Sequence, residues 1–339
     1  MSNWFLRFTV FMSALVMLTT IGQTATLDDV KSRGVLNCGV NKGLPGFSAP
    51  DSKGKWTGMD VDFCRAVAAA IFGDDTKVAY TGLSASSRFG ALSDGKIDLL
   101  SRNTTWTAER DSAMKLDFAG VTYYDGQAFM VRRSLGIISA LQLGSSAICI
   151  QTGTTTELNV ADYFRANNMQ YEVVAFETGA EVVKAYDKER CDAFTADASR
   201  LYAERLGLSN PDEHVVLPEI ISKEPLGPVI REGDDQWSNL IRWVHFAMVN
   251  AEEFEVTSEN VEQMRASNSP AIKRLLGLEG EFGAKLGVSN DWAYNVIRLV
   301  GNYGEVFERN VGPNTPLGIA RGINALWSKG GIQYAPPIR

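Results

Sequence analysis

The sequence predicts an α/β protein built from two similar units. Patterns typical of strands alternate with patterns typical of helices, and this alternation starts a second time near Ala128. Strands that alternate with helices usually pair in parallel within one sheet. The chain has 339 residues, 45% of them hydrophobic and 22% charged. That length suits two domains of about 100–200 residues each, and the composition excludes a disordered chain, a coiled coil and a collagen-like repeat.

The first unit is expected to hold three strands and two helices. Its strands are predicted at residues 35–40, 77–80 and 97–100. The first helix opens at Asp60 and carries apolar residues at the spacing of a single packed face. The second helix covers residues 88–94, and Gly95 is a suitable residue to end it.

The second unit repeats this arrangement, and a helical region follows it. Strands are predicted at residues 128–131, 147–150, 172–176 and 193–195, with helices at about 155–166 and 179–188. From Asp235 onward the sequence is mainly helical, with an apolar stripe that starts at Trp237 and ends at Met248.

The first 25 residues have the parts of a secretory signal peptide. Arg7 is the only charged residue before Asp28, a mostly apolar run follows it, and a small and polar stretch ends at Ala25. The alternative is a membrane anchor, but about 20 apolar residues are needed to span a bilayer and this run is shorter. We therefore expect export, with cleavage near Ala25.

The net charge and the absence of several motifs exclude some classes of function. The chain has 33 Lys and Arg against 40 Asp and Glu, a net charge of -7, which argues against a nucleic-acid partner. Residues 90–96 resemble a phosphate-binding loop, but Ile97 stands where Ser or Thr should hold magnesium. No G-x-S-x-G, H-E-x-x-H or G-x-G-x-x-G motif occurs, and there are only two histidines. We expect no cofactor, no metal site and no catalytic residues.

Four cysteines stand in a chain that we expect to be exported. They are Cys38, Cys64, Cys149 and Cys191, and none forms a C-x-x-C pair. An even number in an oxidising compartment favours disulfides. Three pairings are possible, and buried free thiols remain the alternative.

In the first unit, polar residues follow the third predicted strand. The carboxyl ends of parallel strands are where α/β proteins place ligands. Thr107 is a credible N-cap for the next helix, so Arg110 would project from its first turn into the crevice, where a guanidinium can hold a carboxylate through two hydrogen bonds. The alternative is a surface arginine paired with Asp111 or Glu109.

The second unit offers a matching set of polar residues. Gly153 allows a tight turn at a strand-to-helix junction, and the adjacent threonines present hydroxyl and N–H groups, although a plain helix cap is the alternative. Asp197 follows a strand end and could accept an ammonium group, or it could cap the next helix. Arg110 and Asp197 together describe a clamp for a zwitterion.

Longer segments carry a family resemblance. The sequence resembles the extracellular solute-binding proteins of polar amino-acid ABC importers, and within them the general L-amino-acid (glutamate, glutamine, aspartate, asparagine) periplasmic binding proteins. The resemblance covers residues 27–339, and its most specific stretches are residues 36–40, 58–67, 100–107, 301–312 and 334–337.

The resemblance implies a two-lobed periplasmic-binding-protein fold of type II, with two crossover strands. Lobe 1 would comprise residues 26–124 and 223–312, including a helical insertion at about 254–290. Lobe 2 would comprise residues 125–222, and residues 313–339 would form a C-terminal extension packed on lobe 1. Because each pair then falls within one lobe, we expect the disulfides Cys38–Cys64 and Cys149–Cys191.

The same resemblance assigns roles to individual residues. It implies that Arg110 holds the ligand α-carboxylate, that Asp197 takes the α-ammonium, and that Arg88 meets a side-chain carboxylate. The remaining expected ligand-binding residues are Asn103 and Thr105 beside Arg110, Thr154 and Thr155 as second-lobe donors, and Phe47 as an aromatic lid. Leu44 departs from the pattern, since several relatives have tyrosine there.

The function implied is that of a non-catalytic, monomeric transport receptor. Its lobes would close on one free L-amino acid, from a broad range that favours Glu, Asp, Gln and Asn, and would deliver it to the membrane permease subunits of an ABC importer. Two alternatives remain: an enzyme on the same fold, such as a dehydratase, and a ligand-sensing domain that works with a membrane receptor.

Overall fold

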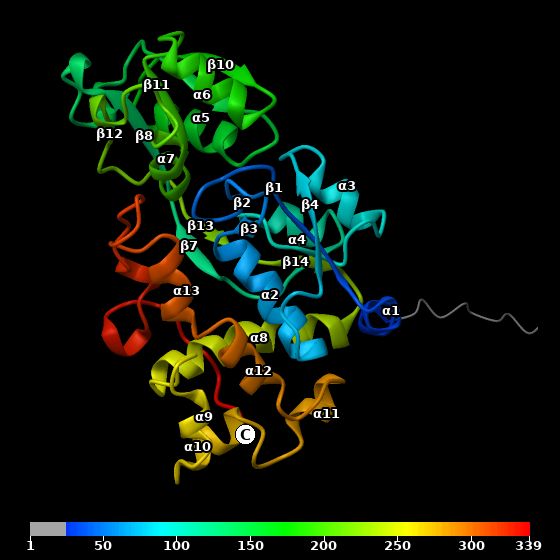
Figure 1. Cartoon of the computed structure of the whole chain (residues 1–339). Coiled ribbons are helices and arrows are strands. Elements are labelled where there is room, and N and C mark those ends of the chain that lie inside the picture. The colour runs from blue at the N-terminus through cyan, green and yellow to red at the C-terminus, as the bar shows by residue number, and fades with distance from the viewer. Residues whose placement is uncertain (1–24) are drawn as a thin grey trace, which may run out of the picture.

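The computed structural model describes residues 25–339, which form two α/β lobes joined by a pair of strands (Figure 1). The predicted signal peptide lies almost wholly outside the described residues. Lobe 2 lies at the top of Figure 1, and lobe 1 with its helical part lies below it. The two-unit α/β architecture predicted from the sequence is confirmed.

Lobe 1 is built on a five-stranded sheet with the strand order β4-β1-β5-β14-β6. Strands β4 and β5 run parallel to β1, whereas β14 runs antiparallel to both β5 and β6. The strands are β1 (Leu36–Asn41), β4 (Val78–Leu83), β5 (Leu99–Leu100), β6 (Leu116–Phe118) and β14 (Val229–Arg231), and a small hairpin adds β2 (Ala49–Pro50) and β3 (Trp56–Thr57).

Four helices of lobe 1 accompany this sheet. They are α1 (Thr26–Arg33), α2 (Met59–Phe72), α3 (Arg88–Ser93) and α4 (Ala108–Ser112). Helix α2 begins after Gly58, whose φ of 126° and close approach to the carbonyl of Phe47 exclude a side chain at this position. It ends at Gly73 in the left-handed conformation, which is a common helix end.

The two lobes are connected by β7 (Tyr123–Asp125) and β13 (Glu224–Leu226), which pair antiparallel. The chain leaves lobe 1 through β7 and returns through β13. A strand that enters a lobe from this hinge starts at the edge where the parallel strands end, so it must run in the opposite direction. For this reason each sheet contains both parallel and antiparallel strand pairs, whereas the local sequence pattern predicts parallel pairs alone.

Lobe 2 has a five-stranded sheet with the order β10-β9-β11-β8-β12. Its strands are β8 (Gln127–Arg132), β9 (Ala147–Gln151), β10 (Glu172–Phe176), β11 (Ala193–Asp197) and β12 (His214–Val216), and its helices are α5 (Thr156–Ala166), α6 (Gly179–Asp187) and α7 (Ala198–Arg205). Strand β8 is antiparallel to β11 and β12, while β9, β10 and β11 are parallel. Apolar clusters cover both faces of the sheet.

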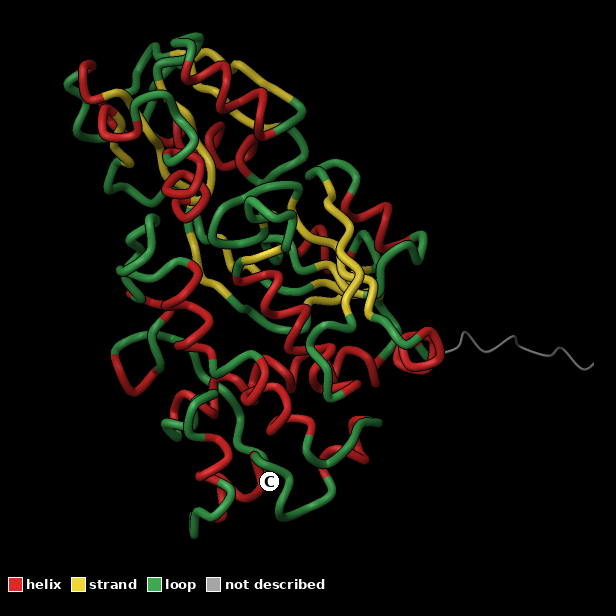
Figure 2. The backbone as a smooth tube through the Cα atoms, viewed as in Figure 1, coloured by secondary structure: helices red, strands yellow, loops and turns green. Residues whose placement is uncertain are grey.

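The helical region after β14 packs against lobe 1, with its first helices on the side away from lobe 2 and its last helix beside the hinge strand β7 (Figures 1 and 2). Its helices are α8 (Asp235–Glu253), α9 (Val261–Met264), α10 (Pro270–Leu275), α11 (Phe282–Leu286), α12 (Trp292–Leu299) and α13 (Tyr303–Asn310). Short 3₁₀ turns occur at Arg133–Leu135, Ala140–Gln142, Pro211–Glu213, Gly322–Asn324 and Trp327–Lys329. None of the helices within residues 25–339 has the length and apolar character needed to cross a bilayer.

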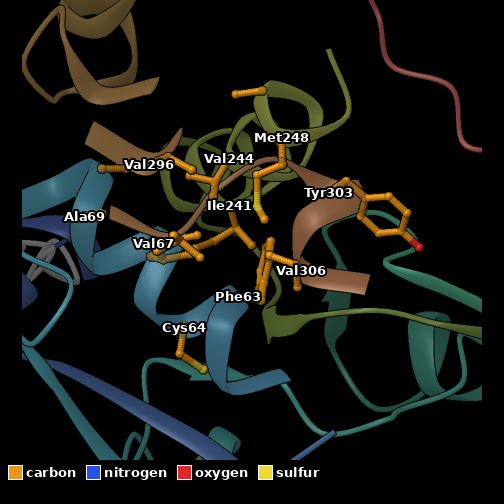
Figure 3. Close-up of a cluster of buried hydrophobic side chains, with 14 of the residues drawn as sticks. Phe63, Cys64, Val67, Ala69, Ile241, Val244, Met248, Val296, Tyr303 and Val306 are labelled. Carbon is orange, nitrogen blue, oxygen red and sulfur yellow. The ribbon is translucent and has the colours of Figure 1, made fainter. Parts of the chain in front are cut away.

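The core of lobe 1 is shared between α2 and the later helices. Figure 3 shows Phe63 and Val67 of α2 facing Ile241 and Val244 of α8 and Val296 of α12. The predicted apolar stripe of the long helix is therefore confirmed, because its members are buried against α2.

Two disulfides lie within the lobes. Cys38 of β1 pairs with Cys64 of α2, and Cys149 of β9 pairs with Cys191 just before β11. This is the pairing that the division into lobes favours. They join residues 26 and 42 positions apart, and by chain entropy such loops stabilise a fold by about 3–4 kcal/mol each.

Candidate functional site: a cavity between the lobes

A small polar cavity lies between the lobes, beside the hinge. It collects seven of the eight expected ligand-binding residues, and five further residues complete its lining. Lobe 1 contributes Arg88, Arg102, Asn103, Thr105 and Arg110, and lobe 2 contributes Gln151, Thr154, Thr155, Thr156, Ala196, Asp197 and Arg200.

Strand directions explain why these residues meet. The segment after β5 carries Asn103 and Thr105, while Gln151 and Asp197 are the last residues of β9 and β11. These parallel strands end at the sheet edges that face each other across the hinge, which is where α/β proteins place ligands.

Arg110 is held in place by its own helix and by a carbonyl. The Thr107 side chain caps α4 by accepting a hydrogen bond from the Arg110 N–H at 3.3 Å, as the sequence predicts. Nη1 of Arg110 donates to the carbonyl of Thr105 at 2.8 Å, and the guanidinium lies 5.3 Å from the ring centre of Phe89. The side chain is buried, so the alternative of an exposed surface arginine is wrong.

Arg88 faces the same ring and is more deeply buried. Its guanidinium carbon lies 4.7 Å from the centre of Phe89, and its Nη1 has only a long contact, 3.4 Å, with the hydroxyl of Thr104. Nε has no hydrogen-bond partner among the described residues. Burial, followed by the charges of Arg102 and Arg110, lowers the pKa of Arg88. A bound anion would accept a hydrogen bond from Nε and would offset the burial of the positive charge.

Asp197 stands at the junction of β11 and α7. It occupies the N-cap position of α7, yet its side chain makes no capping hydrogen bond, so the alternative of a simple helix cap is wrong. Burial, then the charges of Asp125 and Glu224, raise the pKa of Asp197 well above its ordinary value. An ammonium group at this carboxylate would favour its ionised form.

The threonine segment turns at Gly153, which has a φ of 71°. The hydroxyl of Thr154 donates to the carbonyl of Gln151 at 2.7 Å, and that of Thr155 donates to Glu224 at 3.0 Å. Neither hydroxyl caps α5, which leaves the first N–H groups of this helix to serve an anion, since these groups have no partner within the helix.

Asn103 and Thr105 are fixed by buried carboxylates. The Asn103 N–H donates to Asp60 at 2.9 Å, and Asn103 has an unusual positive φ of 28°. The hydroxyl of Thr105 donates to Glu224 at 2.6 Å. Burial raises the pKa of Asp60 to about 6, although its hydrogen bond from Asn103 opposes the shift.

Glu224 is a residue that the sequence analysis did not single out for the site. This buried carboxylate of β13 accepts hydrogen bonds from Thr105 of lobe 1 and from Thr155 and Asn159 of lobe 2, as well as from Ser222. It therefore links both lobes at the hinge. No local signal could identify it, because Thr105 and Thr155 lie 119 and 69 residues away in sequence.

Arg102 and Arg200 were also missed, although a signal existed for each. Arg102 lies within the polar segment that supplied Asn103 and Thr105. Arg200 projects from the first turn of the helix after Asp197, just as Arg110 projects from the first turn of α4. Within residues 25–339, Arg88, Arg102 and Arg110 make no ion pair within 4 Å. The cavity thus holds more positive than negative charge.

Phe47 is not part of the cavity, so its expected role as a lid requires correction. It is only 2% exposed and packs edge-to-face on Tyr123 with ring centres 5.4 Å apart. Its carbonyl accepts the Asp60 N–H at 3.0 Å. The ring belongs to the core of lobe 1.

The charged groups of the site do not form a metal centre. Nowhere in the described part of the chain do three or more His, Cys, Asp or Glu side chains gather in an arrangement that could hold a metal ion. The cavity instead offers guanidinium groups, N–H groups and one carboxylate, which is a set suited to a small zwitterion with additional negative charge.

Comparisons with known proteins show which family the chain resembles. Residues 36–263 match the family described as bacterial extracellular solute-binding proteins, family 3. The chain is 58% identical over the full length of both chains to the general L-amino acid-binding periplasmic protein AapJ of Rhizobium johnstonii. It is 54% identical to the glutamate/glutamine/aspartate/asparagine-binding protein BztA of Rhodobacter capsulatus, over 93% of this chain and 94% of that protein.

A solved structure is similar along nearly the whole chain. It is that of an ABC transporter/periplasmic binding protein from Brucella ovis with glutathione bound. The two share 58% identity and superpose with a TM-score of 0.92, over 94% of this chain and 100% of the other.

Proposed function

This chain belongs to the bacterial extracellular solute-binding proteins of family 3, and we propose that it is a periplasmic receptor that captures a free L-amino acid between its lobes and delivers it to the membrane permease of an ABC importer. The observation that carries the proposal is the meeting of Arg110 from lobe 1 and Asp197 from lobe 2 in one cavity.

Each charged end of the ligand has a partner in this proposal. The guanidinium of Arg110 and the first N–H groups of α5 take the α-carboxylate, and Asp197 takes the α-ammonium. A Kd in the micromolar range corresponds to about 8 kcal/mol. A single amino acid has few atoms, so charge-assisted hydrogen bonds in a site closed to water must supply much of this free energy.

The ligand range is proposed to be broad, with a preference for Glu, Asp, Gln and Asn. Arg88 is the expected partner of a side-chain carboxylate, because it is buried and its Nε lacks a protein partner. The name of the Rhizobium relative supports a broad range of amino acids, and the name of the Rhodobacter relative supports the preference for these four. The glutathione in the Brucella structure supports a site that also accepts extended amino-acid derivatives.

The same proposal holds that the protein works as a monomer without catalysis. The relatives described above are named as binding proteins. Asp197 is the sole carboxylate among the cavity-lining residues, and its place opposite Arg110 suits a ligand ammonium. Incubation with each bound amino acid followed by mass analysis of the ligand tests this, since a changed ligand would indicate turnover.

The experiment that tests the main proposal has two steps. Native mass spectrometry of the mature protein should show a monomer, with any co-purified ligand of amino-acid mass. A thermal-shift screen of the twenty amino acids should then show the largest rise in Tm with glutamate, aspartate, glutamine and asparagine. No rise with any of the twenty after removal of bound ligand would refute the proposal.

A further inference from the structure

We propose that Arg102 and Arg200 form a second anion-binding subsite at the outer end of the cavity, which receives the terminal carboxylate of an amino acid extended through its side chain, such as a γ-glutamyl dipeptide. This inference rests on the proposed amino-acid binding, and it adds the place and the chemistry of a ligand extension.

The first support is the position of the two arginines. A second, larger cleft of about 540 Å³ lies between the lobes next to the amino-acid cavity. Arg102, Gln151 and Arg200 line both the cavity and the cleft. A ligand that extends from one space into the other must therefore pass these three side chains.

The second support is the state of the Arg102 side chain. Arg102 is 5% exposed, and its Nε donates to the carbonyl of Leu83 at 3.0 Å, which fixes the guanidinium. Within the described residues it has no carboxylate partner within 4 Å. Burial, followed by the charge of Arg200, lowers the pKa of Arg102 to about 9. A buried cation beside a second cation is costly unless an anion joins them.

Arg200 approaches from the opposite lobe. Its Nε donates to the carboxylate of Glu204 at 3.3 Å, in an ion pair one turn further along α7. Its Nη2 lies so close to Gly179 that a Cβ there would come within 2.6 Å of it. The backbone of α6 thus leaves room for this guanidinium to face the passage. Because Arg102 and Arg200 come from different lobes, an anion between them would also favour closure.

The cleft beyond these arginines has basic residues on both walls. Lys42 of lobe 1 and Lys184 of lobe 2 line it. Its acidic residues already have partners: Glu204 contacts Arg200, and Asp187 accepts hydrogen bonds from the N–H and hydroxyl of Ser209. The lining therefore favours a carboxylate over an ammonium group.

The direction of the extension follows from the proposed inner site. Arg110 and Asp197 bind the α-carboxylate and the α-ammonium of the ligand. An ordinary α-linked peptide uses one of these two groups in its peptide bond and loses that charge. Only an extension attached through the side chain keeps both charged groups. A γ-glutamyl dipeptide meets this condition and places its terminal carboxylate several bonds beyond the glutamyl unit.

Calorimetry with three ligands tests the inference. The ligands are glutamine as a reference, γ-glutamylglycine, and the same dipeptide with its terminal carboxylate converted to an amide. In the wild type the free acid should bind at least about tenfold more tightly than the amide, because only the acid offers a charge-assisted contact. In Arg102→Gln and in Arg200→Gln this ratio should fall below about threefold. Lys188→Gln, an exposed charge change at the end of α6, should keep the wild-type ratio.

Equal binding of the acid and the amide by the wild type would overturn the inference, and this comparison does not depend on any variant being folded. Retention of the tenfold ratio in both arginine variants would overturn it as well. If none of the twenty amino acids binds, the proposed function is refuted. If glutamine binds while the acid and the amide bind equally, only the second subsite is refuted.

Discussion

Arg110 is held in position by other groups of the protein. Its backbone is fixed by the Thr107 cap, its Nη1 by the carbonyl of Thr105, and its guanidinium lies against Phe89. A side chain held in this way loses little conformational entropy on binding, so more of the hydrogen-bond free energy appears as affinity.

The first prediction concerns this residue. Arg110→Ala should weaken the binding of every amino acid by at least about 2–4 kcal/mol, because the α-carboxylate would be left in the closed site without its charged partner. Calorimetry with glutamine and alanine measures the effect. Arg165→Ala removes an exposed arginine that pairs with Asp162 and should leave both affinities unchanged. Near-normal binding by Arg110→Ala would remove this residue from the site.

Arg88 is predicted to discriminate between ligands rather than to bind all of them equally. Arg88→Ala should reduce affinity for glutamate more than for alanine, since only glutamate carries a side-chain carboxylate. Paired titrations of wild type and variant with both ligands give the difference directly. Equal losses for the two ligands would contradict the assigned role.

Asp60 gives a prediction about pH. Its pKa is raised from 3.8 to about 6 in the folded protein, chiefly by burial, so between about pH 4 and 6 the folded state binds more protons at this group than the unfolded state. The contribution of Asp60 to the free energy of unfolding must then fall as the pH rises through this range. The Tm of the wild type minus the Tm of Asp60→Asn should decrease from pH 4 to pH 6 and then level off. A difference that grows over this range would contradict the assignment.

At the scale of elements, the strand β7 is held from both sides. On one side it pairs with β13. On the other side the C-terminal extension replaces a neighbouring strand, because the Asn324 side chain accepts from the Tyr124 N–H at 2.7 Å and donates to the Tyr124 carbonyl at 2.9 Å. Tyr303 adds a hydrogen bond from its hydroxyl to the carbonyl of Thr122. These contacts anchor the lobe 1 side of the hinge.

This arrangement predicts a local effect of Asn324→Ala. The Tyr124 amide should exchange its hydrogen faster, because it loses its acceptor, while amides of the lobe 2 sheet should keep their wild-type rates. Hydrogen exchange resolved by residue measures both sets in one sample. Unchanged exchange at Tyr124 would show that the extension does not support the hinge strand.

The helices and strands also show which structural features can be predicted from local sequence patterns. Strand ends and helix starts predicted Arg110 and Asp197 as ligand-facing residues, and the structure places both in one cavity, because these features depend on neighbours in the sequence. The antiparallel direction of β8 and β14 was missed, since it follows from the path of the chain through the hinge. Phe47 was misplaced because its ring is buried in the core of lobe 1 and packs on Tyr123, a residue far along the chain. Glu224 gave no signal, as its partners lie far along the chain.

At the scale of the whole molecule, the two lobes meet around charges that neither lobe could satisfy alone. The buried arginines come mainly from lobe 1, Asp197 comes from lobe 2, and Glu224 at the hinge binds side chains of both. A ligand that brings a carboxylate and an ammonium group adds the missing partners, and in this way its binding can be coupled to lobe closure.

A crystal structure of the mature protein grown with L-glutamate tests this central claim most directly. It should show one glutamate between the lobes, with its α-carboxylate on the guanidinium of Arg110 and its ammonium group on Asp197. Glutamate bound elsewhere, or bound in the cavity with neither contact, would contradict the account.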